Sequence, residues 1–251
     1  MNPETLEDAA RLLRSAGRVA VLTGAGISAE SGIPTFRDAL TGLWARYNPE
    51  ELATPQGFAR QPRLVWDWYA ERRTRVGSAR PNPGHHALVK IENHVPDFTL
   101  ITQNVDGLHG AAGSRQVLEL HGNIRRVRCS GEGTVVSQWT DAGGLPPVCP
   151  ECGALLRPDV VWFGEMLPTA ETDAAWRATE RCEVFLSVGT SNLVEPAASL
   201  PWIARRHGAE VIVVNPSMEG QREGLGIHHL TGPAGVVLPA LVRSAWPDHS
   251  G

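Results

Sequence analysis

Five short apolar runs, spaced widely along the chain, limit the possible folds more than any other feature of the sequence. They comprise residues 19–22, 98–101, 117–120, 184–188 and 211–214. The runs are mostly continuous rather than alternating, which is typical of strands buried on both faces of a parallel sheet. Helical segments between them supply the crossovers that parallel strands need. The sequence therefore predicts an α/β fold built on an open parallel sheet.

Two long stretches between the runs predict a second, smaller part of the molecule. Residues 23–97 are too many for one crossover, so we expect an insertion there, helical around residues 64–69. Residues 125–157 are rich in glycine and proline and carry three of the four cysteines. Before the first run, residues 2–4 predict the start of a helix that ends near Gly17.

The charge balance and the lack of a long apolar segment disfavour several classes of function. Basic residues number 23 and acidic residues 27, and no block of like charges forms a basic arm, which disfavours nucleic acid as a partner. The first ten residues are polar where a secretory signal is apolar, and no run reaches the roughly 18 apolar residues of a membrane span. Four cysteines are too few for a disulfide scaffold in a chain of this length. We therefore expect a cytoplasmic protein with neither nucleic acid nor membrane as a partner.

A glycine-rich turn follows the first apolar run. Residues 24–29 fit the pattern G-x-G-x-x-A, which brings a dinucleotide phosphate to backbone N–H groups and a helix N-terminus. Shortly after it, Phe36 and Arg37 add an aromatic ring and a guanidinium that can pair with phosphate. An ordinary tight turn and an Arg37–Asp38 ion pair are the alternatives, since the acidic residue expected near the ribose has no clear candidate. The turn alone leaves both interpretations open.

Six motifs in sequence order give the chain a resemblance to a known family. They are residues 24–37, 102–109, 120–122, 162–165 and 189–191, together with Asn215. Together they resemble the sirtuins, the NAD-dependent protein lysine deacylases, over about residues 8–242. The resemblance implies a Rossmann-like parallel-sheet domain that binds NAD, and a smaller domain made of a helical insertion and a zinc-ribbon-like module. The implied ranges are 1–38, 97–124 and 158–251 for the first domain, 39–96 for the insertion and 125–157 for the zinc-type module.

The resemblance also implies a reaction that consumes NAD as a co-substrate. In sirtuins the carbonyl oxygen of an acylated lysine attacks the nicotinamide ribose, and the products are nicotinamide, free lysine and O-acyl-ADP-ribose. A base must deprotonate a ribose hydroxyl, and imidazole suits this role because its ordinary pKa of ~6.5 lies near working pH. The resemblance assigns the base to His121, which follows the run 117–120 and so lies at the carboxyl end of the sheet. It assigns a second catalytic position to Asn104. Without the family context, a lone His such as His121 is more often structural.

The residues implied to bind NAD follow the predicted strands. Side chains such as Gln103 and Asp106 combine donors and acceptors, as ribose hydroxyls and a carboxamide require, although an Asx turn ending the strand is the alternative. Ala234 matches the residue beside the adenine. The implied cofactor-binding set is Gly24, Ala25, Gly26, Ser28, Phe36, Arg37, Gln103, Asn104, Val105, Asp106, Gly189, Thr190, Ser191, Asn215 and Ala234.

Residues 161–165 match the sirtuin strip that pairs with the backbone of the acylated protein substrate. The implied contacts come from Val161, Phe163, Gly164 and Glu165, with the Val161 carbonyl accepting the lysine N–H. Backbone pairing of this kind tolerates many peptide sequences. We therefore expect weak sequence specificity.

Three residues predict the acyl group that is removed. Tyr69 and Arg72 are three positions apart on an expected helix, so they share a face, and Arg with Tyr can bind a carboxylate. Ala53 matches the small residue that widens the pocket in sirtuins of the desuccinylase and demalonylase class. We therefore expect succinyl and malonyl groups as preferred substrates and acetyl as a poorer one. The alternative is an exposed Arg in an Arg-rich helix.

The cysteines predict an incomplete metal site. Sirtuins carry two C-x-x-C pairs that close a structural zinc site, and Cys149 with Cys152 forms the second pair. In the first pair Cys129 is followed by Glu132 where the second cysteine is expected. Zinc bound by the three cysteines, with Glu132 or solvent as the fourth ligand, and a lobe that folds without metal both remain open.

Three other functions are weighed against deacylation. A protein mono-ADP-ribosyltransferase uses the same activation of NAD but delivers ADP-ribose to a protein. A hydride-transferring dehydrogenase leaves His121 without a clear role. An NAD sensor with little turnover explains NAD binding but not the full set of Asn104, Asp106 and His121.

Overall fold

The computed structural model describes residues 2–34, 49–140, 146–191, 194–217, 224 and 226–247, and its largest element is a six-stranded sheet. The strand order is β3-β2-β1-β7-β8-β9, and every neighbouring pair is parallel. The strands are β1 (Arg18–Thr23), β2 (Asp97–Thr102), β3 (Val117–Glu119), β7 (Val184–Val188), β8 (Glu210–Asn215) and β9 (Ile227–Thr231). The five apolar runs are all strands, as predicted, whereas β9 at the edge of the sheet was not predicted. The predicted α/β fold class is confirmed.

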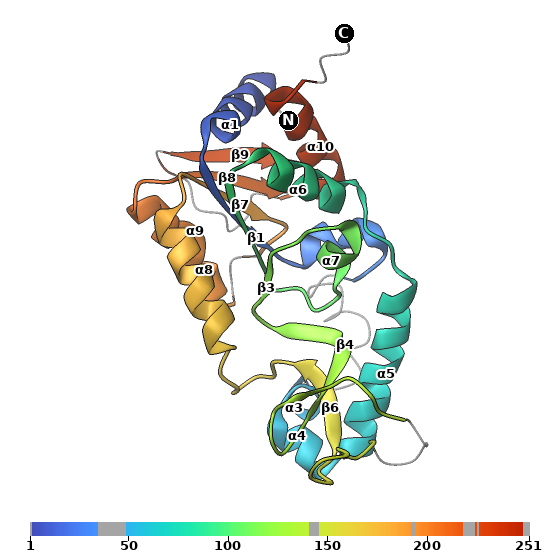
Figure 1. The fold of residues 1–251 in the computed structure, drawn as a ribbon. Helices are drawn as coiled ribbons and strands as arrows, with labels where there is room; N and C mark the ends of the chain where they lie inside the picture. Colours follow the sequence, from blue (N-terminus) through green and yellow to red (C-terminus); the bar gives the residue numbers. More distant parts are fainter. Residues whose placement is uncertain are drawn as a thin grey trace.

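Helices cover both faces of this sheet (Figure 1). One face carries α1 (Pro3–Ser15), α6 (Pro83–His94) and α10 (Ala234–Ala245), and the other carries α8 (Thr169–Arg181) and α9 (Leu200–Arg206). Successive residues of β1 serve the two sides: Val19 and Val21 pack into the first core, and Ala20 and Leu22 pack into the second. Helix α1 starts where it was predicted, with the Asn2 side chain accepting the Glu4 N–H. A strand buried on both sides explains why the apolar runs are continuous.

A small lobe lies at the end of the molecule away from the two chain termini (Figure 1). It combines α3 (Pro49–Leu52), α4 (Pro55–Arg60) and α5 (Pro62–Ser78) with an antiparallel sheet in the order β5-β4-β6. These strands are β4 (Gly122–Cys129), β5 (Val135–Val136) and β6 (Leu156–Val160). Residues of α5, β4 and β6, among them Trp68, Ile124 and Val160, share one buried core. The helices and the small sheet of the lobe are therefore packed as one unit.

The observed elements differ from the predicted ranges in two places. The range 39–96 includes α6, whose Ala87, Leu88 and Ile91 pack onto the large sheet and not into the small lobe. Strands β4 and β6 cross the limits of the range 125–157, because their pairing extends from Cys129 back to Gly122. Both differences arise from contacts between segments that are far apart in the sequence: helix packing for α6 and strand pairing for β4 and β6.

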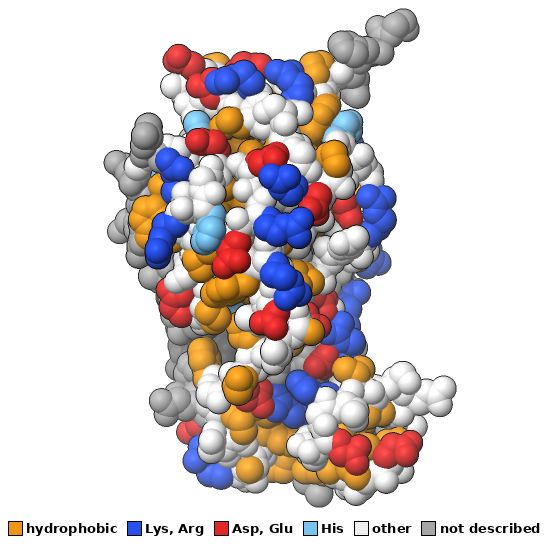
Figure 2. Space-filling view, turned by 60° about the vertical axis from the view of Figure 1, so that its left-hand side comes forward, with side chains coloured by type: hydrophobic (Ala, Val, Ile, Leu, Met, Phe, Trp, Pro, Cys, Tyr) orange, Lys and Arg blue, Asp and Glu red, His pale blue; other side chains and the backbone are white. Residues whose placement is uncertain are grey.

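The remaining short elements connect these parts. They are α7 (Leu108–Ala112) and the 3-10 turns η1 (Ala25–Ile27), η2 (Ala29–Ser31) and η4 (Ala197–Ser199). No helix within the described ranges is both long and apolar enough to cross a membrane. On the side of the molecule that carries α8 and α9, acidic and basic side chains lie interspersed (Figure 2).

Candidate active site

The glycine turn after β1 packs directly against the turn after β7. The Gly24 N–H donates to the Val188 carbonyl (3.0 Å), and the Gly26 N–H donates to the Gly189 carbonyl (2.9 Å). A Cβ on Gly26 would lie 2.7 Å from the Gly189 Cα, so the missing side chain permits this approach. The N–H groups of both glycines thus bond within the protein, and the turn continues as η1 and η2 where a helix N-terminus was expected. The two glycines therefore join two loops of the site, and their contact with NAD stays a prediction.

A buried polar network lies where β1 and β2 end. The Asn104 amide donates to the Gly24 carbonyl (3.1 Å) and to the Ser28 hydroxyl (3.3 Å), and Ser28 donates to Asp106 (2.7 Å). The other oxygen of Asp106 accepts the Leu108 N–H (2.8 Å). Burial raises the pKa of Asp106, and these hydrogen bonds oppose part of that rise. The network holds the Asn104 and Asp106 side chains in fixed positions at the carboxyl edge of the sheet.

Two buried histidines, His85 and His109, pack beside this network and have a structural role, as their sequence context predicts. His109 Nε2 bonds the Thr23 hydroxyl (2.9 Å), which donates to Thr102 (2.8 Å), and the His85 ring lies 4.9 Å from the His109 ring. Burial lowers the pKa of His85 to about 4 and that of His109 to about 3, so both rings are neutral at physiological pH. Their spacing in the sequence does not reveal this contact.

His121 lies in the turn between β3 and β4, and its ring has one nitrogen anchored. Its Nδ1 lies 3.0 Å from the Gln103 carbonyl, which can only accept, so Nδ1 carries the proton and Nε2 has a free lone pair. Burial lowers the pKa of His121, and the bond to Gln103 opposes part of that effect. The next residue, Gly122, has a φ of +79°, and its missing side chain makes room for the Asp159 carbonyl. The arrangement provides a neutral imidazole with a defined tautomer, as a general base requires.

The strip at residues 161–165 joins the His121 turn to the small lobe. The Val161 N–H donates to the His121 carbonyl (2.9 Å), and the Phe163 N–H donates to the Ala53 carbonyl (2.9 Å). Within the described residues, the Val161 carbonyl accepts no hydrogen bond, and the Phe163 side chain is 53% exposed. The Glu165 carboxylate pairs with Arg157 and accepts the Trp162 N–H (2.8 Å). Glu165 therefore stabilises the strip through bonds to Arg157 and the Trp162 N–H. The Val161 carbonyl and the exposed Phe163 ring are placed where a ligand can contact them.

Two of the predicted acyl-pocket residues, Ala53 and Tyr69, lie in the core of the small lobe, and Arg72 is half-buried beside Trp68. The Trp162 indole donates to the Tyr69 hydroxyl (3.0 Å), and burial raises the pKa of Tyr69 to about 12. The Arg72 guanidinium lies 4.6 Å from the centre of the Trp68 ring and, in the part of the chain described, forms no ion pair with a carboxylate. Ala53 belongs to the same buried cluster as Tyr69. Burial lowers the pKa of Arg72, although a guanidinium stays charged in proteins.

The other residues predicted to bind NAD lie partly within and partly outside the described part of the chain. Thr190 and Asn215 are linked, since the Asn215 amide donates to the Thr190 carbonyl (2.8 Å), and Ser191 next to them is exposed. Ala234 is buried at the start of α10, and Ala25 and Val105 are partly buried. Phe36 and Arg37 lie outside the described residues.

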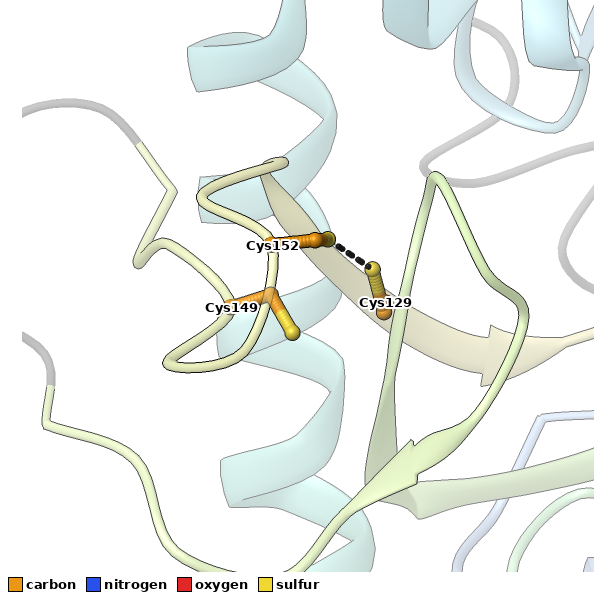
Figure 3. Close-up of side chains that lie close together, drawn as sticks. All are labelled: Cys129, Cys149 and Cys152. Atoms are coloured by element: carbon orange, nitrogen blue, oxygen red, sulfur yellow. Dashed lines mark hydrogen bonds between the residues drawn. The ribbon is translucent and has the colours of Figure 1, made fainter.

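Three cysteines come together at one end of the small sheet (Figure 3). The sulfurs of Cys129, Cys149 and Cys152 all lie within 4.8 Å of one another, and those of Cys129 and Cys152 are 3.3 Å apart. Thiolates at these separations suit a thiophilic ion such as zinc. The Glu132 side chain is exposed, and its carboxylate is not in the cluster. The structure therefore brings together three of the four expected ligand positions.

Comparisons with known proteins agree with this geometry. The chain matches a model of the Sir2 family over residues 24–196. The "NAD-dependent protein deacylase 1" of Pseudomonas aeruginosa is 50% identical over 247 residues, which cover 94% of this chain and 97% of that protein. A solved complex of a Sir2 homologue with NAD has a TM-score of 0.85 and 46% identity, covering 95% of this chain and 93% of that one. A structure of Sir2Af2 bound to a myristoylated histone peptide has a TM-score of 0.74 and 33% identity, covering 97% of each chain. The resemblance predicted from the motifs is thereby confirmed, and the chain belongs to the Sir2 family.

Proposed function

We propose that this protein is an NAD-dependent deacylase that removes acyl groups from lysine side chains of other proteins. The observation that carries the proposal is the ring of His121, with Nδ1 bonded to Gln103 and Nε2 without a hydrogen bond among the described residues. The deacylase name of the Pseudomonas aeruginosa relative and the NAD and acylated-peptide complexes of the solved relatives support the same activity. Bound NAD supplies the ribose that receives the acyl group.

The residues of this chain divide the work between binding and proton transfer. The fixed amide of Asn104 and the carboxylate of Asp106 orient the ribose and the nicotinamide side of the dinucleotide. His121 Nε2 accepts the proton of a ribose hydroxyl, and the Gln103 carbonyl stabilises the imidazolium through Nδ1–H. The Val161 carbonyl accepts the N–H of the acylated lysine beside the exposed ring of Phe163.

Succinyl and malonyl groups are the preferred substrates in this proposal. Because Tyr69 accepts a hydrogen bond from Trp162 and keeps its proton to high pH, its hydroxyl remains a donor toward a ligand. Arg72 is held over Trp68 without a carboxylate partner among the described residues. A carboxylate-bearing acyl group satisfies both donors, whereas an acetyl group leaves the half-buried guanidinium unpaired.

A panel of acetyl, succinyl and malonyl peptides with NAD, read by mass spectrometry, tests both levels of the proposal. We expect nicotinamide, free lysine and O-acyl-ADP-ribose, with no product when NAD is omitted. Conversion without NAD, or ADP-ribose attached to the peptide or protein, would overturn the deacylase assignment.

The double variant Tyr69→Phe/Arg72→Met tests the acyl preference separately. Each lost charge-assisted bond is worth about 1.5–3 kcal/mol, so kcat/KM for the succinyl peptide should fall about a hundredfold or more. The acetyl peptide should change less than about threefold, and so should both peptides with Arg75→Met, which removes an exposed Arg from the same helix. Equal losses for acetyl and succinyl peptides would reject the acidic pocket while leaving deacylation in place.

A further inference from the structure

Two turns that carry the cysteines have the same local conformation. We call residues 129–133 the first cysteine turn and residues 149–153 the second. In each, the carbonyl of the first residue accepts the N–H of the closing glycine, at 3.0 Å for Gly133 and 2.9 Å for Gly153. These glycines have φ of +73° and +74°. The first residue of each turn also donates its own N–H five positions on, from Cys129 to Thr134 (2.8 Å) and from Cys149 to Ala154 (2.7 Å).

This match makes Glu132 the structural counterpart of Cys152. The Cys152 sulfur lies 3.3 Å from that of Cys129. The Glu132 backbone N–H donates to the Cys129 sulfur (3.4 Å), while the exposed side chain keeps its carboxylate out of the cluster. A Glu carboxylate oxygen is two bonds farther from the backbone than a Cys sulfur, so in this turn it reaches past the position that a sulfur would fill. Together the two turns place three cysteine sulfurs in the cluster, and the fourth equivalent position holds Glu132, whose carboxylate lies outside it.

Gly131 of the first cysteine turn lies beside the sulfurs. A Cβ on Gly131 would lie 3.8 Å from the sulfurs of both Cys129 and Cys152, and 3.2 Å from the Ala154 Cβ. Cys129 and Cys149 belong to an apolar core that also includes Trp66 of α5, Val127 and Leu156. Cys129 and Cys149 are therefore buried, whereas Cys152 and the neighbouring turn residue Glu132 are exposed to solvent.

We propose that this cluster binds a thiophilic divalent cation, zinc in the first place, through three thiolates and leaves its fourth coordination position to an exchangeable external donor. Four protein ligands close a structural zinc site, whereas three leave a position for water or another small ligand. The external donor is a nitrogen or sulfur ligand such as an imidazole or a low-molecular-weight thiol, with water in its place otherwise. The proposal does not depend on the deacylase activity.

Cobalt loading of the full chain, reduced beforehand with a phosphine, tests the proposal by spectroscopy. We expect the d–d bands of a four-coordinate site and thiolate charge transfer from three cysteines. Imidazole or a small thiol should shift the d–d bands, and Glu132→Gln should leave both the spectrum and this response unchanged. Glu151→Gln is the matched control, since Glu151 is the exposed acid of the second cysteine turn. Glu132→Cys should raise the charge-transfer intensity from three thiolates to four, abolish the response and slow zinc release to a chelator by about tenfold or more.

Several results would overturn the proposal. Cobalt that keeps its six-coordinate aqueous spectrum shows that the cluster binds no ion, and d–d bands insensitive to external donors show a closed site. A changed spectrum in Glu132→Gln, or in Asp141→Asn outside the described residues, identifies a protein carboxylate as the fourth ligand. Near-ultraviolet circular dichroism of each variant separates these results from misfolding.

Discussion

In the large domain, the polar side chains of the site are held by one another and by the backbone at the ends of adjacent strands. Asn104, Ser28 and Asp106 form such a set, and each hydrogen bond joins segments that the parallel sheet already brings together. In the small lobe, Tyr69 and Arg72 are instead positioned by aromatic side chains on α5 and by Trp162. The part proposed to bind NAD is thus tied to the sheet itself. The part proposed to select the acyl group can change on one helix without disturbing the sheet.

His121→Ala is expected to have the largest effect, because it removes the proton acceptor between the two regions. Deacylation should fall by about 10²–10⁴-fold, the usual contribution of a general base. Binding of NAD, measured by calorimetry, should change little, because the Asn104 network is untouched. His86→Ala, at an exposed position of α6, is the control and should leave activity unchanged. If His121→Ala kept activity within about threefold of the wild type, His121 would not be the general base.

Gly26→Ala tests how tightly the large domain holds its loops together. The new Cβ meets the Gly189 backbone at 2.7 Å, so we expect a loss of about 3 kcal/mol in the free energy of unfolding and weaker NAD binding. Gly110→Ala in α7 has open space around its Cβ and should be neutral or slightly stabilising. Urea denaturation of both variants measures the difference. Equal stabilities would show that the two glycine turns do not need this close approach.

Glu165→Gln tests the charge pair that shapes the strip in the small lobe. The bonds from Arg157 and the Trp162 N–H outweigh burial and lower the pKa of Glu165. The pair therefore stabilises the fold above the ordinary Glu pKa of about 4.3, and this stability is lost as pH falls through the lowered pKa. We expect Glu165→Gln to lose about 1–2 kcal/mol near pH 7 and to approach the wild type in acid.

Glu71→Gln, in an exposed pair with Arg75, provides the comparison for that measurement. Surface pairs of this kind contribute less than about 0.5 kcal/mol, so this variant should resemble the wild type at every pH. Chemical denaturation over a pH series measures both. A constant difference between Glu165→Gln and the wild type down to strong acid would contradict the role given to the Glu165 charge.

The smallest expected effect is a shift in the acid limb of the activity profile. Burial lowers the pKa of His121, so the imidazole stays neutral and can accept a proton below its ordinary value of ~6.5. The acid limb of log kcat/KM against pH should therefore lie below 6.5. A limb above 6.5 would mean that a nearby anion, and not burial, dominates the environment of this ring.

The sheet could be predicted because its strands are buried on both faces. Continuous apolar runs such as 184–188 are typical of such strands, whereas β9 at the sheet edge contains His228 and His229 and lacks that pattern. Strand β4 was hidden in a similar way, because Arg125, Arg126 and Arg128 interrupt its apolar positions.

The sequence motifs predicted the residues of the candidate site but not the contacts between them. The motifs point to Ser28 and Asp106 separately, but their 2.7 Å contact depends on the pairing of β1 with β2, which no local pattern specifies. The pairing of Glu165 with Arg157, eight residues away along the chain, was also missed, and the predicted peptide contact of Glu165 stays a prediction. Contacts between distant segments follow from the fold, so they become visible only when the strands are in register.

The turn that carries His121 is also the point where the chain leaves one sheet for the other, since β3 ends at Glu119 and β4 begins at Gly122. The ring is attached to the large domain through Gln103, and the backbone carbonyl is attached to Val161 of the strip. A change in the relative position of the large domain and the small lobe therefore acts directly on His121, whose ring is bonded to one part and whose backbone is bonded to the other. The position of the proton acceptor relative to the peptide strip is thus set by this one residue.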